Sequence, residues 1–297
     1  MRFGVHLPLM EFGSEGQSLA RLEHAADAAR ECGFAGLAGN DHFVFATPWL
    51  DGPTALAAVV GRSGDMDLMT SIALVSLRGP VPLAKTLQAL DVLSGGRVIA
   101  GVGPGSSARD HELLGVPFEE RWPRFEVATA TLRALLRDEA AEPRLAPRRG
   151  AIPVWIGSWG SDAGLRRVAR LADGWLASAY NTTPAEFARG RERLARALEA
   201  RNREPAGFPN ALGTMWTWIT EDRREEDRVL RDVLAPLLKR DPETLRDQLC
   251  VGPAGRCAEL LSRYAEAGCE RVYLFALGDE RRQVELAAER VVPAVAR

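Results

Sequence analysis

Short apolar runs alternate with longer amphipathic stretches along the whole chain. Each apolar run favours a buried strand, and each amphipathic stretch repeats its apolar residues at the spacing of one helix face. In residues 18–32, for example, one helical face carries Leu19, Leu22, Ala26 and Ala29, and Gly33 follows as the helix end. The predicted strands are 3–7, 36–40, 68–74, 97–102, 154–156, 175–178, 212–219 and 271–275. The predicted helices are 18–32, 53–62, 81–93, 121–137, 162–171, 184–202, charged helices within 222–249, 253–268 and a last helix after the final strand.

This alternation predicts an α/β fold with a parallel sheet, because each strand–helix–strand unit returns the chain to the same edge of the sheet. Eight strands, each followed by helix, suit a closed (β/α)8 TIM barrel better than an open doubly wound sheet. No linker rich in Gly, Ser or Pro divides the sequence. We therefore expect residues 1–297 to form a single domain.

The composition restricts the partners and the compartment. The formal net charge is −2, so there is no basic excess to attract nucleic acid or an anionic membrane. No apolar run reaches the length of a transmembrane helix, and no signal-peptide pattern precedes the first strand. The four cysteines contain no Cys-x-x-Cys pair and are expected to be reduced thiols. We therefore expect a cytoplasmic protein that acts on a small-molecule substrate.

In a TIM barrel the active site lies at the carboxyl ends of the strands, so polar residues at those ends are candidates for chemistry. Asp41 and His42 follow the second strand, and the chain has only four histidines. A histidine there can donate or accept a proton near neutral pH. The alternative, a loop histidine satisfied by hydrogen bonds, stays open. No His-x-His or His-Glu-x-x-His pattern and no carboxylate cluster is present, so we expect no metal site.

Two glycine-rich turns also follow strands. Residues 101–107 lack the full dinucleotide fingerprint, so they are read either as backbone that approaches a flat ligand or, more simply, as a tight turn. Residues 157–161 open a helix, and Ser158 and Ser161 together with free N–H groups would suit a phosphate. An ordinary serine cap is the alternative.

Several segments resemble the luciferase-like monooxygenases. They are Pro-Val-Pro-Leu-Ala-Lys at 80–85, Leu-Asp-Val-Leu-Ser-Gly-Gly-Arg at 90–97, Gly-Val-Gly at 101–103, and the segments 114–121, 153–157, 170–175 and 252–268. The resemblance covers nearly the whole chain. It implies a (β/α)8 barrel that binds reduced FMN or the deazaflavin coenzyme F-420 at its mouth, and it implies a homodimer.

The resemblance also implies roles for individual residues. The segment Asn-Asp-His-Phe at 40–43 is similar to the Ser-Asp-His segment of deazaflavin-dependent members, which implies that Asp41 touches the cofactor and that His42 is the catalytic acid or base. Ser71 and Ile72 align with a site where the family often has a non-prolyl cis peptide that supports the ring. The other implied cofactor residues are Pro104 and Gly105 along the ring, and Gly157, Ser158, Gly160 and Ser161 near the phosphate.

One position departs from the family pattern. Sugar-phosphate dehydrogenases of this class have a glutamate just after the glycine-rich loop, paired with the histidine, and this chain has Ser106. We therefore expect His42 to lack a second acid, which argues against that particular activity. The expected function is hydride transfer or monooxygenation of a small organic substrate, with F-420 slightly favoured by the Asp41–His42 pair. The alternatives are an FMN-dependent monooxygenase, a non-catalytic flavin-binding protein of this fold, and an unrelated TIM-barrel hydrolase without flavin affinity.

Overall fold

The chain folds into a closed barrel of parallel strands surrounded by helices, seen in a computed structural model that describes residues 1–12, 16–45, 47–137, 145 and 150–295. Hydrogen bonds join the strands in the order β10-β1-β2-β3-β5-β6-β7-β8, and β8 pairs with β10 to close the ring. The barrel strands are β1 Arg2–His6, β2 Gly36–Gly39, β3 Asp67–Thr70, β5 Val98–Gly103, β6 Val154–Gly157, β7 Gly174–Ser178, β8 Asn210–Ile219 and β10 Arg271–Ala276. The predicted TIM barrel is confirmed.

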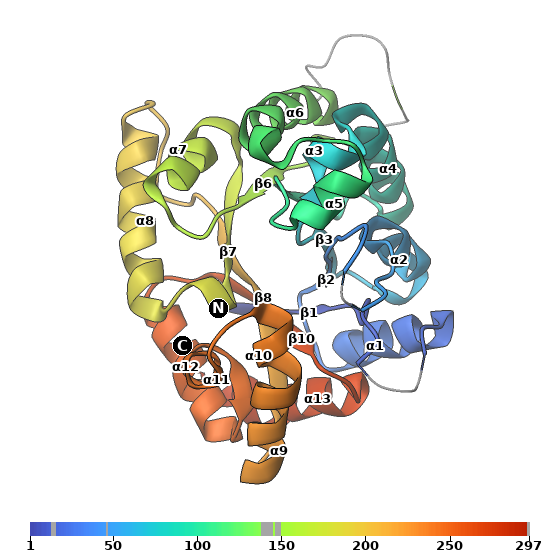
Figure 1. Cartoon of the computed structure of the whole chain (residues 1–297), viewed down its shortest axis with the longest axis vertical. Helices are drawn as coiled ribbons and strands as arrows, with labels where there is room; N and C mark the ends of the chain where they lie inside the picture. The colour runs from blue at the N-terminus through green and yellow to red at the C-terminus, as the bar shows by residue number, and fades with distance from the viewer. Residues whose placement is uncertain (13–15, 46, 138–144, 146–149, 296–297) are drawn as a thin grey trace.

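The helices lie outside the strands (Figure 1). Several of them begin with a capping side chain, such as Ser18 before α1 and Thr183, which forms a capping box with Glu186 at the start of α8. The helices are α1 Leu19–Glu31, α2 Gly52–Ala58, α3 Val75–Arg78, α4 Pro80–Ser94, α5 Ala108–Leu113, α6 Arg121–Leu136, α7 Asp162–Leu171, α8 Pro184–Glu199, α9 Arg223–Arg228, α10 Ala235–Leu238, α11 Pro242–Gln248, α12 Ala254–Glu266 and α13 Glu280–Leu286.

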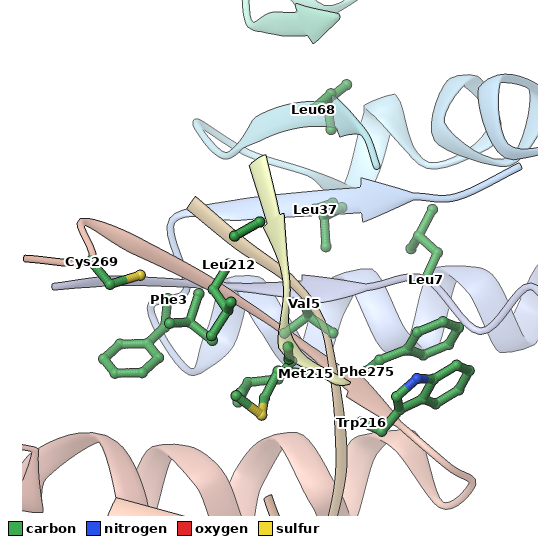
Figure 2. Packing of buried hydrophobic residues seen from close by; sticks show 14 of the residues in the cluster. Phe3, Val5, Leu7, Leu37, Leu68, Leu212, Met215, Trp216, Cys269 and Phe275 are labelled. Atoms are coloured by element: carbon green, nitrogen blue, oxygen red, sulfur yellow. The ribbon is translucent and has the colours of Figure 1, made fainter. Parts of the chain in front are cut away.

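Alternate residues of each strand face two different apolar layers, because successive side chains of a strand point to opposite faces. The small layer fills the barrel and consists of Ala38, Met69, Ile99, Trp155, Leu176, Ala211 and Tyr273. The large layer packs between the strands and the helices, and it includes the neighbouring strand residues Leu37, Leu68 and Val98. Figure 2 shows part of this large layer around Val5 and Leu212. Because alternate strand residues fill these two apolar layers, the strand ends are where polar groups can lie.

The third predicted strand is not continuous, and this prediction was wrong. Residues 68–74 divide into β3 and β4 (Ala73–Leu74), and the peptide bond between Ser71 and Ile72 is cis. β3 pairs with the first residues of β5, Val98 and Ile99, and β4 pairs with its last residues, Val102 and Gly103. The composition of residues 68–74 suits a strand throughout, so the break could not be read from residue type.

One strand outside the barrel escaped the sequence pattern. β9 (Cys250–Gly252) is three residues long and pairs with the carboxyl end of β8. A run this short carries no periodicity to recognise. Among the described residues, every helix is either too short or too polar to cross a membrane.

Candidate active site at the barrel mouth

His42 is held by a buried carboxylate. Its Nδ1 lies 2.7 Å from Oδ2 of Asp110, which is on α5 and fully buried. The other oxygen of Asp110, Oδ1, accepts the backbone N–H groups of Phe43 and Val44 at 2.9 and 2.8 Å. Asp110 therefore fixes both the imidazole of His42 and the loop that carries it.

These contacts decide which nitrogen of His42 carries the proton. Burial by itself would raise the pKa of Asp110, but the hydrogen bonds from His42, Val44 and Phe43 outweigh it and hold the pKa below its usual value. An ionised carboxylate only accepts, so Nδ1–H of His42 donates and Nε2 keeps its lone pair. Nε2 makes no hydrogen bond within the described part of the chain, and the side chain is 19% exposed. The imidazole is thus oriented as a proton acceptor that an incoming molecule can reach.

Asp110 corrects the expectation that His42 lacks a second acid. The family's glutamate position is Ser106, but the acid is supplied four positions later, in the first turn of α5. The sequence holds one signal for it, because Ser107 caps α5 by accepting the N–H of Asp110, a Ser-x-x-Asp pattern at a helix start. That pattern predicts a helix, and it contains nothing that links Asp110 to His42.

Asp41 is nearly fully buried, and both of its carboxylate oxygens accept hydrogen bonds. Arg78 binds both of them, with Nε and Nη2 each 2.6 Å from an oxygen, and the backbone N–H of Leu74 donates at 3.1 Å. Arg78 also pairs with Asp51, the cap of α2. Two carboxylates raise the pKa of Arg78 against the effect of burial. Asp41 therefore anchors the segment before His42 to α3, beside the mouth.

Ser71 and Ile72 occupy the inside of the barrel next to this segment. Glycines make room for both of them: a Cβ on Gly103 would lie 2.2 Å from Cδ1 of Ile72, one on Gly157 would lie 3.1 Å from Cγ2 of Ile72, and one on Gly213 would lie 2.9 Å from Oγ of Ser71. Gly103 and Gly157 thus serve packing around Ile72. This packing favours the interpretation of residues 101–107 as a tight turn over their interpretation as backbone that approaches a flat ligand.

Pro104 and Gly105 form a rigid turn between β5 and α5. The carbonyl of Pro104 accepts hydrogen bonds from Ser76 at 3.2 Å and from Nε2 of His111 at 3.1 Å. Gly105 has φ +83°, which a side chain would strain, and its α-carbon faces His111 and Leu74. His111 is fully buried, so it is a structural histidine that holds this turn.

Residues 157–161 form the turn between β6 and α7. Oγ of Ser158 accepts the N–H of Gly160 at 3.3 Å, and Oγ of Ser161 caps α7 by accepting the N–H of Gly164 at 3.2 Å. Both hydroxyls therefore serve the turn itself, as the serine-cap alternative requires. Gly160 has φ +90°, a conformation that glycine adopts without strain.

A cation lies beside the same turn. A Cβ on Gly160 would lie 3.9 Å from Nη2 of Arg193, which comes from α8. Arg193 also faces Asp162, with 3.4 Å between Nη1 and Oδ1. The positive end of α7 and the guanidinium together form a region that attracts an anion, partly offset by the Asp162 carboxylate.

Among the buried polar atoms without a hydrogen-bond partner in the described part of the chain, four come from strands or from the residues just after them. They are Nδ1 of His6, Oδ1 of Asn40, Oγ of Ser71 and Nε1 of Trp216, from β1, the end of β2, the end of β3 and β8. Each of these side chains is at most 7% exposed. Buried polar groups are almost always hydrogen-bonded, so each unpartnered group of this kind calls for a partner such as an ordered water, an ion or a bound ligand. Within the described residues no group of three or more His, Cys, Asp or Glu is arranged to hold a metal ion.

Comparison with known proteins gives the family. The family model described as luciferase-like monooxygenase matches residues 1–237. The chain belongs to this family. An uncharacterized protein of Mycobacterium tuberculosis is 33% identical over 149 residues, which are 46% of this chain and 50% of that protein. The chain thus spans about half the length of the curated relatives it first matches.

Two solved structures show how widely this luciferase-like fold is shared. An F420-dependent secondary alcohol dehydrogenase in complex with an F420–acetone adduct has a TM-score of 0.84 and 16% identity, over 100% of this chain and 99% of that one. The oxygenating constituent of 3,6-diketocamphane monooxygenase from Pseudomonas putida, in complex with FMN, has a TM-score of 0.76 and 16% identity, over 100% and 99%. At these identities the likeness shows the fold.

Proposed function

We propose that this luciferase-like protein is an oxidoreductase that binds coenzyme F-420 or FMN at the barrel mouth and acts on a small organic substrate. The observation that carries the proposal is the His42–Asp110 pair, because a buried aspartate that orients a reachable imidazole is an arrangement for moving protons. Proteins with the same fold are described with each of the two cofactors. When bound, the ring supplies hydride transfer or oxygen activation.

In this proposal His42 moves one proton. Its Nε2 lone pair takes the proton from the substrate's reacting oxygen or returns it in the opposite direction, and the charge of Asp110 stabilises the imidazolium that forms. Asp41 holds the His42 segment against α3 through Arg78. Positioned general acids and bases typically contribute a factor of about 10²–10⁴ in rate.

The residues present fit a flat ring with a phosphate tail. The unpartnered polar atoms of Asn40, Ser71 and Trp216 offer hydrogen bonds to the polar edge of a ring, and Arg193 with the start of α7 offers a site for the phosphate. The proposed cofactor residues are Asp41, Ser71, Ile72, Pro104, Gly105, Gly157, Ser158, Gly160 and Ser161. We also propose one domain over residues 1–297 and a cytoplasmic location, and from the family resemblance a homodimer. Light scattering of the purified protein tests the homodimer.

The first experiment is a titration of the purified protein with F-420 and with reduced FMN, followed by fluorescence. We expect tight binding of one ring, with F-420 favoured by the Asp41–His42 segment. Binding of neither ring contradicts the proposal and favours the unrelated TIM-barrel alternative.

The second experiment tests catalysis with the ring that binds. Secondary alcohols and ketones are offered with F-420, and ketones with reduced FMN and oxygen. We expect His42→Ala to keep ring binding and to lower turnover by about 10²–10⁴-fold, while His24→Ala, a change at an exposed histidine of α1, leaves turnover unchanged. Equal turnover by both variants refutes the acid–base role. Ring binding without any turnover favours the non-catalytic alternative.

A further inference from the structure

His6 is a nearly fully buried titratable side chain of the mouth and has no role in the proposal above. It ends β1, is 1% exposed and points into the barrel, where its ring stacks on Phe275 with 4.7 Å between centroids and an interplanar angle of 17°. Phe275 stacks in turn on Trp216 at 4.1 Å, and Figure 2 shows these two rings side by side. Tyr273 packs against His6 in an edge-to-face arrangement, with 6.1 Å between the ring centroids. The aromatic neighbours therefore hold the imidazole in one plane.

A bulge in β8 decides the protonation of His6. The pairing of β8 with β10 shifts by one residue between Leu212 and Met215, and Thr214 within the bulge has φ +53°. This conformation turns the N–H of Thr214 toward His6, and it donates to Nε2 at 3.3 Å. A backbone N–H can only donate, so Nε2 carries the lone pair and the neutral imidazole carries its proton on Nδ1.

A chain of side chains keeps the bulge in place. Nδ2 of Asn181 donates to Oγ of Ser178 at 3.1 Å, Ser178 Oγ lies 3.1 Å from Oγ1 of Thr214, and Thr214 donates to the carbonyl of Gly213 at 2.8 Å. Because Asn181 donates to Ser178 and Thr214 donates to Gly213, Ser178 donates to Thr214. Arg240 donates to Oδ1 of Asn181 at 3.0 Å. The donor and the acceptor of each hydroxyl hydrogen bond are thus assigned, and these bonds hold Thr214, whose backbone N–H donates to His6.

The Nδ1–H of His6 has no acceptor among the described residues. The side chain of Ser71, whose hydroxyl is also unpartnered, lies against Gly213, the residue before Thr214. His6 therefore shares one part of the barrel with the cis peptide of Ser71 and Ile72. A buried donor without an acceptor costs about 1–3 kcal/mol, so an acceptor from a bound molecule would remove a real penalty.

We propose that His6 donates a hydrogen bond from Nδ1 to a carbonyl oxygen of the molecule bound in the mouth, and so acts as a second binding residue beside His42. The inference rests on the proposed function, because it requires a ligand in the barrel mouth. Both the ring and an organic substrate can present such an oxygen. Burial lowers the pKa of His6 to about 3, so the side chain stays a neutral donor and does not compete with His42 as the acid or base.

The first test uses the wild-type protein without ligand. Nitrogen-15 NMR of histidine-labelled protein reports which ring nitrogen carries the proton. We expect His6 to be protonated at Nδ1 and to show no titration between about pH 5 and 8, unlike an ordinary histidine. A proton on Nε2, or titration in that range, overturns the proposal even if no variant folds.

The second test compares His6→Asn, which can place an N–H donor near the position of Nδ1, with His6→Phe, which keeps a ring and removes the donor. We expect His6→Phe to weaken binding about tenfold and His6→Asn to restore most of the loss. If the acceptor belongs to the ring, the dissociation constant of the ring rises in His6→Phe. If it belongs to the substrate, KM rises while ring binding stays the same.

Wild-type ring binding tests the proposed function separately. Equal ring binding and equal KM in both folded variants overturn the role of His6 and leave the proposed function intact.

Discussion

Replacing Asp110 tests the core of the site, because two substitutions at this position should have different effects. Asp110→Ala removes the acceptor of three hydrogen bonds, those from Nδ1 of His42 and from the N–H groups of Phe43 and Val44. Asp110→Asn keeps a side-chain oxygen for the two backbone groups and turns an NH₂ group toward His42. Asp110→Ala should therefore destabilise the loop that carries His42, and Asp110→Asn should mainly change which nitrogen of His42 is protonated.

The magnitudes follow from burial. An unsatisfied buried donor costs about 1–3 kcal/mol, and because the two backbone N–H groups are only partly buried the lower part of that range applies to each. We expect Asp110→Ala to lower the free energy of unfolding by about 2–4 kcal/mol and Asp110→Asn by about 1 kcal/mol. In Asp110→Asn the NH₂ group can only donate, so Nδ1 of His42 becomes the acceptor and the proton moves to Nε2. The lone pair that faces the substrate is then lost.

Two measurements check this reasoning. Urea unfolding of the wild type and both variants gives the stability differences, with Asp65→Asn as a control at an exposed aspartate. Nitrogen-15 NMR gives the protonated nitrogen of His42 in the wild type and in Asp110→Asn. The reasoning is refuted if Asp110→Ala is as stable as the control, or if the proton of His42 stays on Nδ1 in Asp110→Asn.

Three further predictions concern stability. Gly101→Ala would place a Cβ 1.9 Å from a backbone carbonyl oxygen, so it should cost about 3 kcal/mol or more in urea unfolding, whereas Gly255→Ala, with open space around its Cβ on α12, should gain about 0.5–1 kcal/mol. Arg78→Met leaves a buried carboxylate without its partner and should cost about 3 kcal/mol, and Arg124→Met, at an exposed ion pair, should change stability by less than about 0.5 kcal/mol. Because the folded state lowers the pKa of Asp110, the stability advantage of the wild type over Asp110→Asn should be full above about pH 4–5 and shrink as the pH falls further, which unfolding curves at several pH values would show. A constant advantage down to about pH 2 would contradict that assignment.

Local patterns in the sequence were enough to predict the barrel. The alternation of apolar runs and amphipathic stretches, with capping residues such as Ser18 and Thr183, is a property of neighbouring residues, and it sets the element order of a (β/α)8 fold. The same order places His42 and Asp41 at a strand end, because parallel strands bring their carboxyl ends to one side. Residue type and position therefore predicted which segments gather at the mouth.

The pairings within the site were decided only by the tertiary structure. Asp110 lies 68 positions from His42, and Thr214 lies 208 positions from His6, so no local pattern connects either pair. The bulge at Thr214 lies where β8 pairs with β10, and residue type does not encode it, whereas the cis peptide after Ser71 was expected from the family resemblance alone. The sequence by itself determined where the chemistry would lie, because periodicity and strand order are local. The fold decided which proton each imidazole carries, because that depends on partners brought together from distant parts of the chain.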